Sequence, residues 1–307
     1  MNLVFGLDGG GTSTRLRIAD EDNRSIWEGS GSGINPNATP INAIAERLEV
    51  LFGEGYRATG LSAQDFAGGC LGVAGADRPG ERAELTSLFR ERLGISCPLE
   101  VAADSDIALV GGLRRCEGFL LVAGTGSIAI ARLADGTRFR SGGLGHFLGD
   151  EGSAFFIGFE AMRRSLRSVE GRDVPTAMLE PLLLFFGLEN ATEFVPLVYR
   201  RFDKALIAGA ADLAERYRAA GDELAVSIMD EARDELVRLV VSARAQASGM
   251  INEPSLVLSG GLFEHNAWLR DSVSANLAET CPDLAQTPPL ENATFGACLL
   301  ALSRLGQ

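Results

Sequence analysis

The sequence has little of what several classes of functional site require. Only two histidines are present, His146 and His265, and the five cysteines show no CxxC or paired-ligand spacing. These counts argue against a zinc centre or a disulfide framework, and they favour reduced thiols in a cytoplasmic protein. No apolar run is long enough to cross a bilayer, and no basic-then-apolar signal stands at the N-terminus.

Cations are also scarce relative to acids. The chain has 28 lysine and arginine residues against 41 aspartate and glutamate residues, giving a net charge of −13. This balance argues against a nucleic-acid backbone or an anionic membrane as a partner. Hydrophobic residues make up 46% of the 307 residues, enough for a sizeable core. The length corresponds to about two domains of ~150 residues each.

A glycine-rich loop follows the first predicted strand. Residues 3–14 read LVFGLDGGGTST, and strands are predicted over 2–7, 15–18 and 25–27, so the glycines lie in a hairpin loop. Glycine permits positive φ and close backbone approach, so several N–H groups can converge on one phosphate. The alternative is an ordinary glycine-rich hairpin turn.

The same layout occurs a second time. Residues 118–140 read GFLLVAGTGSIAIARLADGTRFR, with strands predicted over 120–123 and 128–133 on either side of Gly-Thr-Gly-Ser. Two such halves predict a phosphate chain held between two loops. Neither loop contains the GxxxxGK[ST] motif, and a strand rather than a helix follows each loop, which excludes the dinucleotide-binding fingerprint.

The two loops carry no lysine or arginine at their tips. A bound polyphosphate would therefore need backbone dipoles and a divalent cation. Asp8, at the end of the first strand, is placed to hold Mg²⁺ through water, because Mg²⁺ keeps several waters and takes few carboxylates. The alternative is that Asp8 only caps the turn.

Strands alternate with helices through the first part of the chain, which predicts an α/β sheet with the site at the strand ends. Thr39 and Pro40 begin a helix that Gly53 ends, and Asn35 lies in the preceding loop. Asp104 follows the third buried strand, with Asp106 two residues later inside a short helix. The remaining predicted elements are strands over 66–76 and 99–103 and a helix over 79–93.

The second part repeats the theme with a mostly helical insert, residues 159–250. Before it, residues 141–158 read SGGLGHFLGDEGSAFFIG, and their glycine content indicates a shaped loop. Asp150 could accept hydrogen bonds from hydroxyl groups, or it could be the N-cap of the next helix, and the two roles are compatible. The other predicted elements are a helix over 222–247, a strand over 256–261, a helix from Asn266, and a C-terminal helix over 291–305.

These motifs together resemble the actin-like ATPase superfamily of sugar kinases and actin. Within it the chain looks like the N-acetylglucosamine kinase branch of the BadF/BadG/BcrA/BcrD ATPase family, over nearly the full length. The motifs that carry the resemblance are FGLDGGGTST, GINPN, GVAGADRP, ADSDIAL, AGTGS, GGLGHFLGDEGSAFFIG and LSGG.

The resemblance implies an α/β fold of two actin-like (ribonuclease H-like) domains flanking an ATP and sugar cleft. The expected domains are residues 1–115 with 288–307, and residues 116–287, hinged over 113–118. It also implies roles for single residues. Asp104 would be the general base, in preference to Asp106, and Asp8 would anchor Mg²⁺. The residues expected at ATP are Gly10, Gly11, Thr12, Gly124, Thr125, Gly126, Gly260 and Gly261; those expected at the sugar are Asn35, Asp104, Gly143, Leu144, Gly145 and Asp150.

The resemblance implies an ATP-dependent kinase for the 6-hydroxyl of N-acetylglucosamine or glucosamine, acting as a cytoplasmic homodimer without a nucleic-acid or membrane partner. Leu144 stands where relatives acting on N-acetylglucosamine can carry an aromatic residue. One alternative is an ATPase that activates a reductase, but those proteins carry cluster-ligating cysteines near the second loop, where this chain has Ala123. Another is a non-enzymatic module that uses ATP as a switch.

Overall fold

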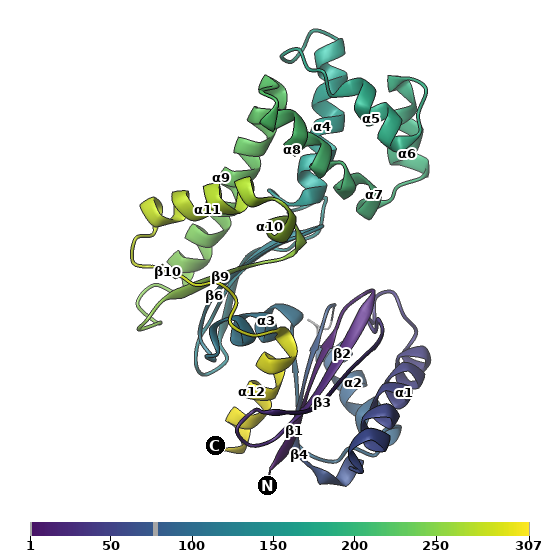
Figure 1. The fold of residues 1–307 in the computed structure, drawn as a ribbon, viewed down its shortest axis with the longest axis vertical. Helices are drawn as coiled ribbons and strands as arrows, with labels where there is room; N and C mark the ends of the chain where they lie inside the picture. Colours follow the sequence, from purple (N-terminus) through teal and green to yellow (C-terminus); the bar gives the residue numbers. More distant parts are fainter. Residues whose placement is uncertain (1, 76–78, 307) are drawn as a thin grey trace. The chain divides into compact units, whose positions relative to one another are not determined.

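The computed structural model describes residues 2–75 and 79–306. The chain divides into two compact units (Figure 1). The first comprises residues 1–118, 132–137 and 287–307, and the second comprises residues 119–131 and 138–286. The domain limits expected above, and the hinge over 113–118, stay predictions.

The first unit is built on a five-stranded sheet with strand order β3-β2-β1-β4-β5. Strand β1 pairs antiparallel with β2 and parallel with β4, and β4 pairs parallel with β5. This is the mixed α/β sheet predicted from the alternation of strands and helices. Its elements in chain order are β1 (Leu3–Gly9), β2 (Ser13–Ala19), β3 (Ser25–Ser32), α1 (Ile41–Thr59), η1 (Ala63–Asp65), β4 (Phe66–Val73), α2 (Pro79–Glu91), β5 (Leu99–Ala102), α3 (Asp104–Leu113) and α12 (Ala293–Leu305).

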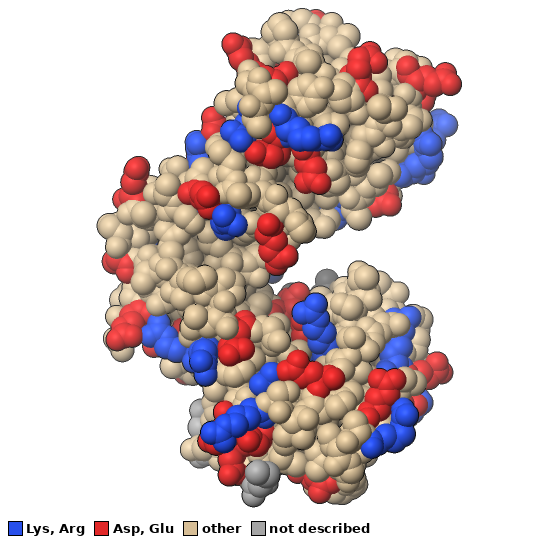
Figure 2. All heavy atoms as spheres, in the orientation of Figure 1, with Lys and Arg blue, Asp and Glu red and all other residues tan. Residues whose placement is uncertain are grey.

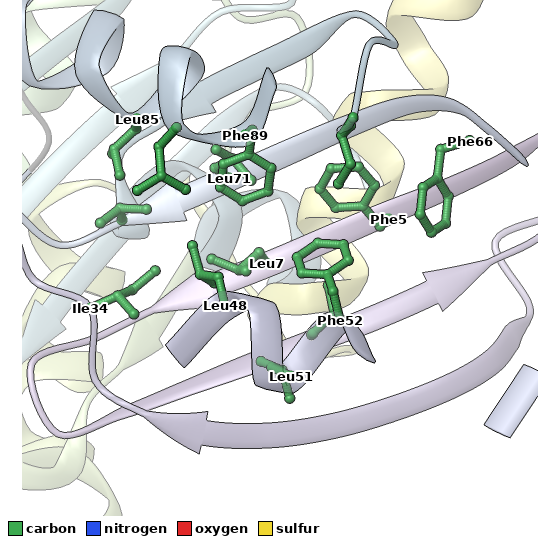
Figure 3. Packing of buried hydrophobic residues seen from close by; sticks show 14 of the residues in the cluster. Phe5, Leu7, Ile34, Leu48, Leu51, Phe52, Phe66, Leu71, Leu85 and Phe89 are labelled. Atoms are coloured by element: carbon green, nitrogen blue, oxygen red, sulfur yellow. The ribbon is translucent and has the colours of Figure 1, made fainter. Parts of the chain in front are cut away.

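Alternate residues of β1 point to opposite faces of this sheet, as the strand period requires. Phe5 and Leu7 lie on the face covered by α1 and α2, where their neighbours include Phe52 of α1 and Phe89 of α2 (Figure 3). The rings of Phe5 and Phe52 meet edge to face with centroids 5.2 Å apart. All four side chains are at most 1% exposed, so this cluster fixes β1, and with it the loop that follows.

Helix α12 returns to the first unit and packs beside α3, β1 and β4 (Figure 1). The helices α3 and α12 cross at two glycines, Gly111 and Gly296. A Cβ atom added at Gly296 would overlap the carbonyl oxygen of Ile107, and one added at Gly111 would overlap that of Asn292. The two backbones are therefore in direct contact, which only glycine allows at these positions.

The second unit repeats the strand order of the first. Its sheet has the order β10-β9-β6-β7-β8. Strands β6, β7 and β8 correspond to β1, β2 and β3, and β9 and β10 continue the sheet beside β6 as β4 and β5 do beside β1. The two glycine-rich loops occupy equivalent places, after β1 and after β6. Its elements are β6 (Gly118–Ala123), β7 (Ser127–Arg132), β8 (Arg138–Gly142), α4 (Ala154–Val169), α5 (Leu179–Phe186), η2 (Ala191–Glu193), α6 (Phe194–Arg200), α7 (Lys204–Gly209), α8 (Ala211–Ala219), α9 (Glu223–Gln246), β9 (Ser255–Ser259), α10 (Gly261–His265), α11 (Ala267–Thr280) and β10 (Ala285–Gln286).

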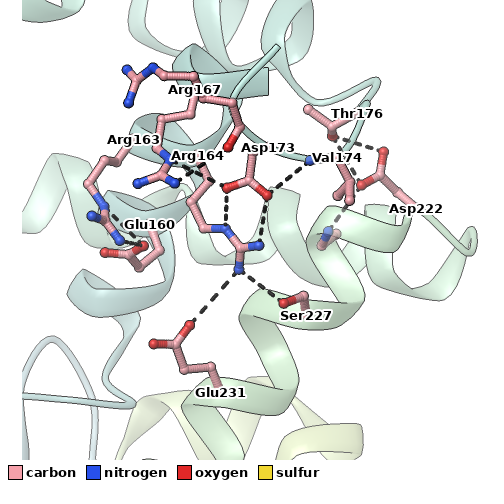
Figure 4. Close-up of polar contacts among 12 residues, drawn as sticks. Glu160, Arg163, Arg164, Arg167, Asp173, Val174, Thr176, Asp222, Ser227 and Glu231 are labelled. Carbon is pink, nitrogen blue, oxygen red and sulfur yellow. Dashed lines mark hydrogen bonds and ion pairs between the residues drawn. The ribbon is translucent and has the colours of Figure 1, made fainter. Parts of the chain in front are cut away.

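A polar network ties the helical insert of the second unit together (Figure 4). Arg164 of α4 donates two hydrogen bonds to Asp173, both at 3.0 Å, and a third to Ser227 of α9. The bonds from Arg164 lower the pKa of the Asp173 carboxyl. Asp222 caps α9 and also accepts from the hydroxyl of Thr176, at 2.9 Å. Bidentate pairs of this kind fix geometry as well as charge, so α4 and α9 hold one another in place.

Three predictions about element ends were wrong. Helix α1 does not end at Gly53 but continues to Thr59, because its apolar face continues past that glycine; Gly60, in the left-handed conformation, ends it. Its N-cap is Pro40 rather than Thr39. Strand β3 extends to Ser32 instead of ending at Trp27, since it stays paired with β2 along its whole length.

Surface charges of both signs are interspersed on the face shown in Figure 2. Several form ion pairs, such as Arg244 with Asp283 at 2.6 Å. All five cysteines are free. Among the described residues no single helix combines the length and the apolar composition needed to cross a membrane; only a bent pair, residues 179–186 with 191–200, meets that test.

The crossing of α3 and α12 generates a prediction about stability. Gly296→Ala should destabilise the protein by about 1–3 kcal/mol, because the added methyl group has no space against α3. Gly53→Ala is the matched control, since a Cβ atom there meets nothing within 4 Å. It should stabilise α1 by about 0.5–1 kcal/mol. Urea unfolding of both variants measures the difference, and equal midpoints would contradict the proposed packing constraint.

Candidate active site

The first glycine loop is a tight turn between β1 and β2. Gly10 N–H donates to the carbonyl of Ser13 at 2.9 Å, and the loop is backed by Ile34 N–H, which donates to Gly10 at 3.0 Å. In the described part of the chain the N–H groups of Gly11 and Thr12 donate to no protein acceptor. Both residues are exposed, so their N–H groups can bind an anion.

Asp8 and Asp104 lie within electrostatic range of one another in the first unit. Asp8 is the penultimate residue of β1 and is half-buried. Burial raises its pKa most, the charge of Asp104 raises it further, and Arg15 partly opposes both. Asp104 is the first residue of α3, where its Oδ1 accepts from Ser105 N–H at 2.8 Å, and its side chain is exposed. A cation between these carboxylates would relieve their repulsion.

Asp106 occupies a different environment from Asp104. It is 9% exposed, and its Oδ2 accepts from the N–H of Ala103 at 3.4 Å. This bond closes the first turn of α3, so Asp106 acts on the helix start. The prediction that Asp106 lies inside the short helix is confirmed.

Asn35 follows the loop segment that backs the first glycine loop. Gly33 N–H donates to Thr12 at 3.1 Å, and the Oδ1 atom of Asn35 accepts from Asn37 N–H at 2.9 Å. A Cβ atom at Gly33 would overlap the carbonyl of Gly11, so this glycine allows the Asn35 loop to pack closely against the first glycine loop. Of the motif GVAGADRP, residues 76–78 lie outside the described part of the chain.

The second glycine loop is packed against the carboxylate of Asp150. Gly124 N–H donates to Gly126 at 2.9 Å, and Ser127 N–H donates to Asp150 Oδ1 at 3.3 Å. A Cβ atom at Gly126 would come within 2.9–3.1 Å of the Asp150 carboxylate atoms. Thr125, at the tip, is exposed. The second loop and Asp150 therefore form one unit of structure.

Asp150 is not the N-cap of α4, so that alternative was wrong. The N-cap is Ser153, whose hydroxyl accepts from Phe156 N–H at 3.2 Å. Asp150 instead has a left-handed backbone, with φ of 59°, and is 4% exposed. Its Oδ2 accepts from Lys204 Nζ at 2.8 Å. Lys204 was missed by sequence reasoning, although it is the only lysine in the chain.

The remaining predicted residues flank the second loop. Gly143 N–H donates to Ser127 at 2.9 Å, and Gly145 accepts from Gly149 N–H at 2.8 Å, so residues 143–149 form a compact turn. Leu144 in this turn is 53% exposed. Gly260 packs onto the backbone of Ala123, the last residue of β6, and it precedes Gly261, which opens the short helix α10.

The structure thus gathers the predicted residues into two groups. The first unit holds Asp8, the loop 10–12, Asn35 and Asp104, and the second holds the loop 124–126, residues 143–145, Asp150, and Gly260 with Gly261. Among the described residues no group of three or more histidine, cysteine, aspartate or glutamate side chains is arranged to hold a metal ion. The roles assigned to these residues stay predictions.

The family model for the BadF/BadG/BcrA/BcrD ATPase family matches residues 5–301. An N-acetylmuramic acid/N-acetylglucosamine kinase from Clostridium acetobutylicum is 31% identical over 305 residues, covering 99% of each chain. An N-acetyl-D-glucosamine kinase from Dictyostelium discoideum is 26% identical over 313 residues, covering 98% of each chain.

Solved structures show the same fold. A protein from Chromobacterium violaceum, assigned provisionally as an N-acetylglucosamine kinase, superposes with a TM-score of 0.76 at 25% identity, covering 98% of this chain and 99% of that one. A ROK family glucokinase from Streptomyces griseus, in complex with glucose and AMPPNP, has a TM-score of 0.54 at 16% identity and covers 98% of this chain and 100% of that one. The predicted fold class is confirmed.

The raised pKa of Asp8 predicts a pH-dependent effect on stability. Burial and Asp104 disfavour the ionised form in the folded state, so ionisation destabilises the protein progressively as the pH rises above 3.8, and the full penalty is present above the raised folded pKa. Asp8→Asn should therefore raise the melting temperature of the ligand-free protein at neutral pH. The gain should shrink as the pH falls toward 3.8, the ordinary value for aspartate. Thermal unfolding of both proteins across this range tests it; a constant difference would contradict it.

Proposed function

This chain belongs to the BadF/BadG/BcrA/BcrD ATPase family, and on that premise we propose that it is an ATP-dependent amino sugar kinase. The substrate we propose is N-acetylglucosamine or glucosamine, phosphorylated at its 6-hydroxyl. The curated relatives in Clostridium and Dictyostelium, which match over almost the whole chain, support the amino sugar. A screen of ATP consumption by the purified protein, with and without each sugar, tests the proposal.

One observation carries the proposal: the exposed carboxylate of Asp104 interacts electrostatically with Asp8. Both residues belong to the unit that contains the first glycine loop. Kinase chemistry needs this combination. The loop N–H groups bind phosphate oxygens, and a carboxylate within reach of the sugar hydroxyl accepts its proton. ATP would contact residues 10–12, 124–126, Gly260 and Gly261, while Asn35, residues 143–145 and Asp150 would contact the sugar.

In the proposed reaction the sugar oxygen forms a bond to the γ-phosphorus as the bond from that phosphorus to the ADP oxygen breaks. Asp104 accepts the hydroxyl proton. The transition state carries its charge mainly on the phosphoryl oxygens, so positioning and charge stabilisation supply most of the acceleration. Uncharged loop N–H groups can do this without reorganisation, because the hairpins already hold them in place.

We also propose that Asp8 holds Mg²⁺. The donor set fits this ion, because Mg²⁺ takes one or two carboxylates together with substrate phosphates and waters. Burial and the charge of Asp104 raise the pKa of Asp8 and so disfavour its ionised form. A bound divalent cation would favour the ionised form instead. When bound, Mg²⁺ neutralises phosphate charge, which the loops cannot do through cationic side chains.

We also propose that the protein works in the cytoplasm and that it forms a homodimer. All five cysteines are free, and four are buried, which fits the reducing cytoplasm. The family resemblance implies a homodimer, which light scattering of the purified protein measures directly.

The nucleotide site predicts a selective loss of ATP affinity. Thr12→Val and Thr125→Val each remove a hydroxyl at an exposed loop tip. Each should weaken ATP binding roughly tenfold, because a hydrogen bond to a charged group contributes about 1.5–3 kcal/mol. Thr280→Val removes an exposed hydroxyl at the end of α11 and should change nothing. Isothermal titration with ATP checks all three, and unchanged affinity in both loop variants would refute the site.

The proposed base predicts a large loss of turnover. Asp104→Asn preserves the side-chain shape but removes the proton acceptor, so kcat should fall by roughly 10²–10⁴-fold while affinities for ATP and sugar change little. Asp106→Asn should act mainly on stability, because Asp106 closes the first turn of α3. Steady-state kinetics measures the effect on kcat, and circular dichroism measures the effect on folding. If Asp104→Asn stayed active while Asp106→Asn were folded but inactive, the general base would be Asp106 instead of Asp104.

A further inference from the structure

The first residue of α7 brings the only lysine of the chain against the buried carboxylate of Asp150. Lys204 Nζ donates to Asp150 Oδ2 at 2.8 Å. The chain has 28 lysine and arginine residues, and all the others are arginines. A lysine differs chemically from them, because its compact ammonium on a flexible stem can meet one carboxylate oxygen without occupying both.

The Asp150 carboxylate keeps unused acceptor capacity. An ionised carboxylate offers about four lone-pair sites, and the structure fills one on Oδ2 with Lys204 and one on Oδ1 with Ser127 N–H. The side chain of Asp150 is 6% exposed and that of Lys204 is 32% exposed. The ion pair therefore reaches the surface on the lysine side, and sites on Asp150 remain for hydroxyl donors.

A second contact joins the same segment to the same loop. Phe202, two residues before Lys204, stacks on His146 with ring centroids 4.9 Å apart and planes 20° apart. It also stacks on Phe147 at 6.1 Å. Residues 202–204, here termed the α7 clamp, thus touch the 143–150 loop through an aromatic stack in its middle and an ion pair at its end.

The α7 clamp is itself held in place by the helical insert. Asp203 caps α7, because its Oδ1 accepts from Ala205 N–H at 2.9 Å and Leu206 N–H at 3.0 Å. Gly158 of α4 packs directly on the backbone of Ile207 in α7. The network of α4 and α9 shown in Figure 4 then fixes the position of α4. Lys204 therefore approaches Asp150 from a rigid support.

We propose that Lys204 is a positioning residue for the sugar site: it orients the Asp150 carboxylate so that the remaining acceptor sites meet sugar hydroxyls. The inference rests on the proposed function, in which Asp150 binds the amino sugar. The helical insert thereby acts on sugar affinity through the α7 clamp, and Lys204 takes no part in phosphoryl transfer.

A double-mutant cycle tests the inference. Lys204→Met should raise the sugar KM roughly 10–100-fold, because a buried carboxylate loses a charged partner, while kcat and the KM for ATP stay within about threefold. In an Asp150→Asn background Lys204→Met should add little. Arg201→Met is the control, since Arg201 is exposed and makes no ion pair or hydrogen bond among the described residues. Unchanged kinetics in Lys204→Met, or additive effects in the double variant, would overturn the inference.

The single lysine permits a second measurement that needs no variant. Reductive methylation with ¹³C-formaldehyde labels only Lys204 and the α-amino group, so its NMR signal is assigned at once. N-acetylglucosamine or glucosamine should shift the Lys204 signal with the same concentration dependence as activity. An unmoved signal at saturating sugar would refute the inference even if Lys204→Met failed to fold. A wild-type protein without sugar-dependent ATP consumption would instead refute the proposed function.

Discussion

The carboxylate of Asp150 is the feature on which the second half of the candidate site depends. Asp150 is buried and has a left-handed backbone. Its carboxylate packs against Gly126 and accepts hydrogen bonds from Ser127 N–H and Lys204 Nζ. A buried charge is tolerated only when it is paired and hydrogen-bonded. The second glycine loop packs against this carboxylate, and Ser127 of β7 and Lys204 of the helical insert donate hydrogen bonds to it, so the arrangement of these segments follows from solvating this one group.

The first unit treats its acids differently. Asp8 and Asp104 repel each other, and burial raises the pKa of Asp8 further. Arg15 lowers this pKa only in part. Asp150, by contrast, pairs with a cationic side chain within the fold, Lys204. In the proposed function, the first unit would supply the metal ligand and the proton acceptor, and the second would hold Asp150 in a fixed geometry for the sugar.

The helical insert supports the Asp150 site. Its ion pairs bind α4 to α9 through Arg164, and its α7 clamp reaches the turn that carries Leu144. The insert is thereby in contact with the 143–150 loop, which is part of the proposed sugar site.

The sequence by itself determined the duplicated hairpins, the α/β class and most strand positions. These rest on local signals: glycine after an apolar run, period-two alternation, and caps such as Asn266 before α11. It did not determine the end of α1 at Thr59, the cap at Ser153, or the partner of Asp150. Gly53 does not end its helix because the flanking apolar face stays buried, and Lys204 meets Asp150 across 54 residues. Such contacts depend on how the insert folds back, and only tertiary packing decides that.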